Sequence, residues 1–95
     1  MVWRTTDLAD EDIAEIENYG TITFGRSRAE KYVDDLFSAF ELLAAMPRIA
    51  QQHDDLPGKP RIYHFRSHRV IYTIDGEDAV IVRVLHASRN IPRQL

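Results

Sequence analysis

The chain has 95 residues, of which 44% are apolar and 28% are charged. This length suits a single domain spanning residues 1–95, and the composition is that of a folded chain rather than a disordered or collagenous one. The lack of cysteine excludes disulfides, thiolate catalysis and cysteine-ligated metal sites, and it favours a reducing compartment.

Hydropathy gives no indication of a membrane protein. The apolar run at residues 42–46 is far shorter than the ~20 residues that span a bilayer. The first four residues, Met1-Val2-Trp3-Arg4, show no signal-peptide pattern. We therefore expect a cytoplasmic protein.

The net charge of −3 divides unevenly along the chain. Residues 1–46 carry four basic and ten acidic side chains, a net of −6, whereas residues 47–95 carry eight basic and five acidic side chains, a net of +3. Besides an ordinary solvated surface, this split indicates either pairing between the two halves or a basic face for an acidic partner.

The first half predicts a strand and a helix. Val2–Thr5 is a β-branched stretch with Trp3, typical of an edge strand. A helix is expected over residues 7–23, because Thr6 or Asp7 can cap it and acidic residues crowd its first turn. The apolar spacing predicts its buried face: Ala9, Ile13, Ile16, and Tyr19 or Gly20.

A second helix follows closely. Ser27 and Glu30 match a capping box, which predicts a helix start, and Pro47 ends the helical pattern. Its apolar positions recur at helical spacing: Tyr32, Val33, Leu36, Phe37, Phe40, Leu43 and Ala44. Because only about residues 24–26 link the two helices, they must be antiparallel neighbours.

The second half predicts a loop over residues 47–60 and then three strands. The strands are expected at Arg61–Phe65, Val70–Asp75 and Ala79–His86, in an antiparallel meander with short turns. The last strand is apolar on both faces except at Arg83 and His86, so it should lie centrally. The predicted fold is α+β, with the order β-α-α-β-β-β and the helical hairpin on one sheet face.

The sheet half carries most of the candidate binding groups: Lys59, Arg61, Arg66, Arg69, Arg83, Arg89 and Arg93, with His64, His68 and His86. Converging arginines could bind phosphate or carboxylate. Regular alternation places Arg83 on the face of Ile81 and Leu85. Val84 and His86 then share the opposite face, so Arg83 and His86 share a site only if the strand ends or bulges. The simpler interpretations are an Arg83 paired with an acid of the chain and a His86 bonded to backbone.

No pattern predicts catalysis, a metal or a cofactor. His64 and His68 lack a carboxylate at a ligand spacing. The acidic pairs at residues 34–35 and 54–55 fall on a wet helix face and a loop, and no glycine-rich phosphate loop occurs.

Several segments of the chain resemble ParE toxins of the RelE/ParE toxin–antitoxin superfamily. They are "IVRVLHASRNIPRQL" at the C-terminus, "FG" at residues 24–25, "AMPRIAQQHDDLPGKPRIY" and "HRVIYTID". The most specific part is "RVLH", with Arg83, Leu85 and His86. The resemblance implies a toxin that inhibits DNA gyrase stoichiometrically by binding. It also implies a hetero-oligomer with a ParD-like antitoxin whose C-terminal segment covers the hairpin and sheet.

Two other functions remain open within the superfamily. A RelE-like ribosome-dependent mRNA endoribonuclease needs basic side chains and a proton-transfer group. This chain has no tyrosine after Tyr72, and only Lys59 stands just before the second strand. The third alternative is a protein that retains only antitoxin binding. We expect no direct sequence-specific binding of nucleic acid.

Two helices cannot cover a four-stranded sheet, so we expect an apolar groove that a partner helix or strand fills. The candidate antitoxin contacts are Trp3, Leu8, Tyr32, Phe40, Arg61 and Arg83. The candidate gyrase contacts are Arg83, His86, Arg89 and Arg93.

Overall fold

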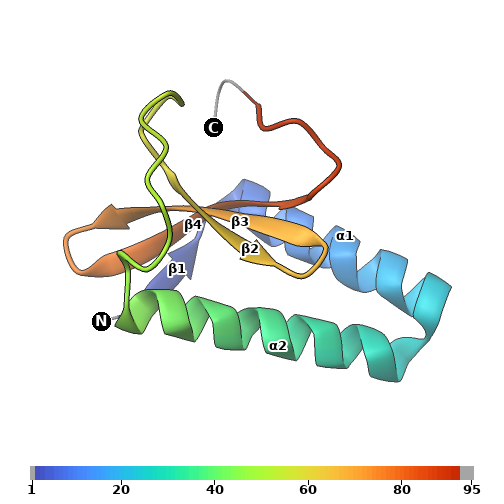
Figure 1. Ribbon diagram of the computed structural model, residues 1–95. Coiled ribbons are helices and arrows are strands. Elements are labelled where there is room, and N and C mark those ends of the chain that lie inside the picture. Colours follow the sequence, from blue (N-terminus) through green and yellow to red (C-terminus); the bar gives the residue numbers. More distant parts are fainter. Residues whose placement is uncertain (1, 93–95) are drawn as a thin grey trace.

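A computed structural model describes residues 2–92, which fold into a four-stranded sheet and a helical hairpin (Figure 1). The elements are, in order, β1 (Trp3–Thr5), α1 (Asp7–Phe24), α2 (Arg26–Ala45), β2 (Arg61–Phe65), β3 (His68–Asp75) and β4 (Asp78–His86). The predicted α+β order is confirmed. β3 and β4 begin two residues and one residue earlier than expected, because the tight turns at residues 66–67 and 76–77 let strand pairing continue up to each turn.

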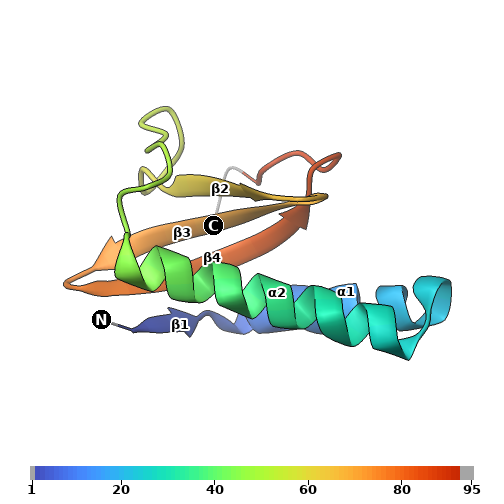
Figure 2. The ribbon, with the colours of Figure 1, turned by 60° about the horizontal axis from the view of Figure 1, so that its bottom comes forward.

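The strand order in the sheet is β1-β4-β3-β2, so β4 lies between two strands as predicted. β1 runs parallel to β4, whereas β2, β3 and β4 pair antiparallel, which makes the sheet mixed. Both helices cover one face, and the loop before β2 and the segment after β4 lie on the other side of the sheet (Figure 2).

Thr6 caps α1, since its hydroxyl accepts a hydrogen bond from the backbone N–H of Ala9 at 3.1 Å. Gly25 alone joins the helices, with a φ of +92° that favours glycine. The capping-box prediction is wrong, because this one-residue connection starts α2 at Arg26 and leaves Ser27 inside the first turn without a side-chain cap. Within residues 2–92, neither helix combines the length and apolar character needed to cross a bilayer.

The main core lies between the hairpin and the sheet. Its largest fully buried members are Leu36, Phe40, Leu43, Tyr72 and Ile81. On α1 the predicted buried face is confirmed for Ala9, and Ile13 and Ile16 pack against the core. Of the two alternatives at its end, Gly20 is half-buried, whereas 65% of the Tyr19 surface is exposed. On α2, Phe37 is likewise 37% exposed.

A second, smaller cluster occupies the sheet face that carries no helix. Ile62, Ile71 and Leu85 form it, and Leu56 from the loop and Ile91 from the C-terminal segment pack against it. The C-terminal segment therefore helps to cover this face.

Candidate partner-binding groove

An apolar groove of about 340 Å³ opens between the tip of the hairpin and the turn that joins β2 to β3. The hairpin projects beyond the sheet at this end (Figures 1 and 2). α1 and α2, of 18 and 20 residues, both run past the turn between β2 and β3. The groove occupies this overhang.

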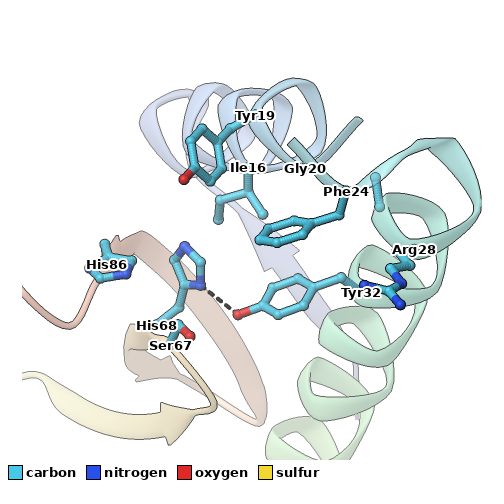
Figure 3. A pocket seen from close by; sticks show the side chains of 10 residues that line it. Ile16, Tyr19, Gly20, Phe24, Arg28, Tyr32, Ser67, His68 and His86 are labelled. Atoms are coloured by element: carbon cyan, nitrogen blue, oxygen red, sulfur yellow. Dashed lines mark hydrogen bonds between the residues drawn. The ribbon is translucent and has the colours of Figure 1, made fainter. Parts of the chain in front are cut away.

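Four elements supply the side chains that matter in the groove (Figure 3). They are Ile16, Tyr19 and Phe24 from α1, Tyr32 from α2, and His68 and His86 from β3 and β4. Tyr19 and Phe24 meet edge to face at 6.4 Å and are 65% and 58% exposed. Exposed aromatic side chains at the rim of a concave apolar surface are typical of a protein-binding site.

The floor of the groove is a hydrogen-bonded pair. The hydroxyl of Tyr32 lies 2.6 Å from Nδ1 of His68. Burial raises the pKa of Tyr32, while burial and then the neighbouring His86 lower the pKa of His68. Both shifts favour the neutral forms. In the tautomer with the His68 proton on Nε2, Nδ1 accepts the hydrogen bond that the phenol donates.

His86 stands opposite His68, since the two are paired positions of β3 and β4 and their rings lie 5.4 Å apart. Nδ1 of His86 accepts the backbone N–H of Ser88 at 3.1 Å and lies 2.7 Å from its hydroxyl. The interpretation of His86 as a backbone-bonded residue at the strand end is therefore confirmed. A hollow of about 260 Å³ adjoins the groove here, and Glu15 and Arg89 contribute to its walls.

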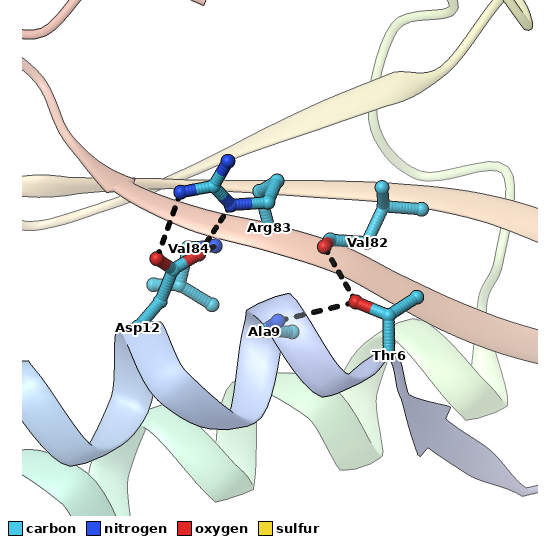
Figure 4. A network of polar contacts seen from close by, with 6 residues as sticks. All are labelled: Thr6, Ala9, Asp12, Val82, Arg83 and Val84. Atoms are coloured by element: carbon cyan, nitrogen blue, oxygen red, sulfur yellow. Dashed lines mark hydrogen bonds and ion pairs between the residues drawn. The ribbon is translucent and has the colours of Figure 1, made fainter. Parts of the chain in front are cut away.

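Arg83 does not line the groove and is held by α1 (Figure 4). Its Nε and Nη2 donate to the carboxylate of Asp12 at 2.7 and 3.0 Å, and the backbone N–H of Val84 donates to the same carboxylate at 2.9 Å. Asp12 is only 6% exposed, and its hydrogen bonds raise the pKa of Arg83. Arg83 thus pairs with an acid of the chain, as the simpler interpretation had it.

The predicted alternation of β4 is wrong beyond Ile81. The register with β3 shifts there, so that Ile71 pairs with Arg83 but Tyr72 pairs with Ile81, which leaves Val82 as an extra residue. This bulge puts Ile81 and Val84 in the same core, whereas regular alternation separates them.

The remaining candidate antitoxin residues do not gather at the groove. Trp3 packs on Phe40 with ring centroids 5.0 Å apart, and its Nε1 donates to Glu41. Phe40 is fully buried, so the expectation that an exposed part of it contacts a partner is wrong. Leu8 is 48% exposed but does not line the groove.

Arg61 holds the preceding loop by donating to the carbonyl oxygen of Ala50 at 2.7 Å. Tyr32 is therefore the candidate antitoxin residue that reaches the groove. Of the candidate gyrase residues, His86 and Arg89 come together at the hollow, and Arg93 lies outside the described residues.

Sequence reasoning did not single out Tyr19 and Phe24 as binding residues. No pattern within one element indicates them, because their exposure depends on where the hairpin tip lies relative to the sheet. Within residues 2–92, four ion pairs join the two halves. Arg83 pairs with Asp12 at 2.7 Å and Arg66 with Asp35 at 2.8 Å, and Arg4 pairs with Asp75 and Asp78. This outcome agrees with pairing between the halves, the first of the two explanations for the charge split.

Known proteins similar in sequence to this chain share one family. The family described as "ParE toxin of type II toxin-antitoxin system, parDE" matches residues 4–91. Toxin ParE1 of Mycobacterium tuberculosis is 33% identical over 86 residues, which are 86% of this chain and 88% of the relative. Toxin ParE1 of Caulobacter vibrioides is 31% identical over 88 residues, 93% of this chain and 91% of that protein.

A similar fold occurs in the solved structure of the "Chromosomal ParDE TA system from P. aeruginosa". It superposes with a TM-score of 0.78 at 20% sequence identity and covers 90% of this chain and 95% of that one. This likeness supports the fold, while the family match and the two relatives cover most of the sequence. The chain therefore belongs to the ParE toxin family of parDE type II toxin–antitoxin systems.

Proposed function

We propose that this ParE toxin inhibits DNA gyrase by binding to it, without catalysing a reaction, and that a ParD-like antitoxin neutralises it by docking in the groove. Family membership supports the target and the partner, and a gyrase target places the action in the cytoplasm. The observation that carries the docking proposal is the open apolar groove with Tyr19 and Phe24 exposed on its rim.

The shape and chemistry of the groove suit an antitoxin segment. Its walls are mainly aliphatic and aromatic, and its polar floor pair, Tyr32 and His68, is already hydrogen-bonded within the toxin. A segment that inserts an apolar side chain would remove Tyr19 and Phe24 from water, and burial of such aromatic surface dominates many protein interfaces.

The arrangement of the arginines favours binding over ribonuclease chemistry. Arg83 is engaged by the buried Asp12, and Arg61 is engaged by the loop carbonyl of Ala50. Arg61 pairs with Tyr72 at one end of β2, whereas His68 pairs with Phe65 at the other end, roughly 13 Å away along the strand. Arg61 and the histidine pair therefore do not converge on one phosphate.

A supercoiling assay with purified toxin and gyrase tests the target. We expect loss of supercoiling or accumulation of cleaved DNA, and restoration of activity when the ParD-like antitoxin is added. Unaffected gyrase would contradict the proposal. Codon-specific cleavage of mRNA on ribosomes would favour the endoribonuclease alternative instead.

Replacing exposed aromatic residues tests the docking site. Tyr19→Ala and Phe24→Ala should each weaken antitoxin binding by about tenfold or more, because each removes rim contact area. Ile22→Ala is the matched control, since Ile22 lies on the same helix and is 78% exposed but does not line the groove. Equal losses in all three variants, measured by titration calorimetry, would place the antitoxin elsewhere.

A further inference from the structure

The groove contains two histidines whose hydrogen bonds, within residues 2–92, are made through Nδ1 alone. The backbone N–H of Ser88 donates to Nδ1 of His86 at 3.1 Å, so a neutral His86 carries its proton on Nε2. Nδ1 of His68 lies 2.6 Å from the hydroxyl of Tyr32. Whether Tyr32 donates to a neutral ring or accepts from a protonated one, Nε2 of His68 bears a hydrogen. Both rings therefore keep an N–H donor that the toxin itself does not use.

The donor of His68 points into the space that a partner would fill. Figure 3 shows the ring nitrogen that does not bind Tyr32 directed toward Ile16 and Tyr19, which line both the groove and the adjoining hollow. A docked segment would remove this N–H from water, and a donor that is buried without an acceptor weakens binding. A tightly bound segment therefore places an acceptor on Nε2 of His68.

The charges around this donor favour an acceptor that is negative. Four charged residues line the groove and the hollow: Asp12, Glu15, Arg28 and Arg89. Asp12 is already paired with Arg83, and Arg66, which stacks over Tyr32, is paired with Asp35. The other three lining groups have no ion pair within residues 2–92. Two guanidinium groups against one carboxylate leave an excess of one positive charge, which a partner carboxylate would balance.

We propose that the antitoxin segment in the groove carries an aspartate or glutamate whose carboxylate accepts a hydrogen bond from Nε2 of His68. The inference rests on the proposed function, since it takes the groove as the antitoxin site, and it adds the chemistry of the contacting residue. A charge-assisted hydrogen bond of this kind is stronger than one to a neutral acceptor. Apolar neighbours of the acid would cover Tyr19 and Phe24. Arg89, at the exposed rim, adds a weak attraction, and Glu15 adds a weak repulsion.

Double-mutant cycles between toxin and antitoxin test this contact. Each aspartate and glutamate in the C-terminal segment of the ParD-like antitoxin is replaced by its amide. Each variant is titrated by calorimetry, at about pH 8, against wild-type toxin and against His68→Leu. One replacement should weaken binding to the wild type by roughly tenfold or more but have little effect on His68→Leu, which has already lost the donor. His64→Leu is the matched control, since His64 is exposed on β2 outside the groove and the hollow, and it should preserve the full effect.

Glu15→Gln tests the sign of the partner charge without altering a histidine. Loss of this carboxylate should strengthen antitoxin binding by up to about threefold, because the repulsion between two exposed like charges is removed. Glu17→Gln is the matched control, since Glu17 is also exposed on α1 but lines neither the groove nor the hollow. An affinity of Glu15→Gln no higher than that of Glu17→Gln would overturn the inference, and a lower one would indicate a partner cation.

The inference also fails if the antitoxin segment has no acid whose effect depends on His68. If Tyr19→Ala and Phe24→Ala still weaken binding in that case, the proposed docking site stands and only the carboxylate is wrong. If those two variants behave like Ile22→Ala, the docking site itself is wrong. His68→Phe, which has a ring of similar size without the donor, gives the same cycle if His68→Leu does not fold.

Discussion

At the scale of single residues, Asp12 supplies a hydrogen-bond acceptor to the part of β4 that β1 does not pair with. β1 ends at Thr5, so beyond that point β4 has no neighbouring strand on this side. The Thr6 hydroxyl donates to the carbonyl oxygen of Val82 at 2.8 Å, and the Asp12 carboxylate then accepts from Val84. Side chains of α1 and its cap thus replace the missing strand and fix the helix against the sheet.

Asp12→Ala should lower the free energy of unfolding by about 2–4 kcal/mol, because it leaves Arg83 unpaired and the Val84 N–H without an acceptor. Glu15→Ala, at an exposed position one turn further along the helix, should stay within about 0.5 kcal/mol of the wild type. Urea unfolding of the two variants provides the comparison. Similar midpoints would show that the Asp12 contacts contribute nothing to stability.

His68 gives the free toxin a pH-dependent stability of known sign. Its folded-state pKa is lowered, mainly by burial, so around pH 6 the unfolded chain binds more protons than the folded one. The free energy of unfolding should therefore fall as the pH drops through the ordinary histidine value of about 6.5 toward the lowered pKa. Urea unfolding at a series of pH values measures this slope, and His68→Gln should reduce it. An unchanged slope in that variant would assign the effect to other groups.

At the scale of elements, the spacing of apolar residues predicted the helices and strands correctly where burial of those residues determines the local structure. The helical spacing of Leu36, Phe40 and Leu43 reflects a buried stripe, and the apolar β4 is central because both of its faces are covered. Predictions from local sequence patterns were wrong where contacts between elements determine the local structure. Gly25 made a connection too short for the capping box at Ser27, and the bulge at Val82 reversed the alternation of β4.

The groove could not be predicted for a related reason. It depends on how far the hairpin extends past the sheet, which is a relation between elements rather than a pattern within one. Tyr19 fits the apolar period of α1, yet it lies past the part of the helix that the sheet covers, so its surface stays exposed. Tyr32 was predicted as a contact and does reach the groove, because its helix passes along the floor.

The two helix starts provide a direct comparison of caps. Thr6→Ala should cost about 1–2 kcal/mol, because the hydroxyl both caps α1 and binds Val82. Ser27→Ala should change the free energy of unfolding by less than about 0.5 kcal/mol, since no side-chain cap is present at the start of α2. Thermal or urea unfolding of both variants tests this, and a large loss in Ser27→Ala would restore the capping-box interpretation.

At the scale of the whole molecule, the two candidate partner surfaces are neighbours. The hollow that Arg89 lines shares Ile16, Tyr19 and the histidine pair with the groove. An antitoxin seated in the groove would therefore lie beside the residues proposed to contact gyrase. Arg48 and Arg61 line a separate hollow at the other end of the sheet, near the turn between β3 and β4.

This layout determines how the gyrase contact is best tested. Deleting residues 90–95 would also remove Ile91, which packs on the cluster of Ile62, Ile71 and Leu85, so a loss of toxicity would mix binding with stability. A point substitution at Arg89 avoids this, because its carbonyl oxygen, which accepts a hydrogen bond from Arg69, is retained.

Arg89→Ala should reduce gyrase inhibition by about tenfold, since an exposed cation is lost from the proposed contact surface. Antitoxin affinity should change by no more than about threefold, because rim charges contribute little to affinity. Arg48→Ala removes an equally exposed charge from the distant hollow and should alter neither property. The measurements are the toxin concentration that halves supercoiling and the dissociation constant for the antitoxin. Equal effects of the two substitutions on gyrase would mean that net charge, rather than the surface beside the groove, governs inhibition.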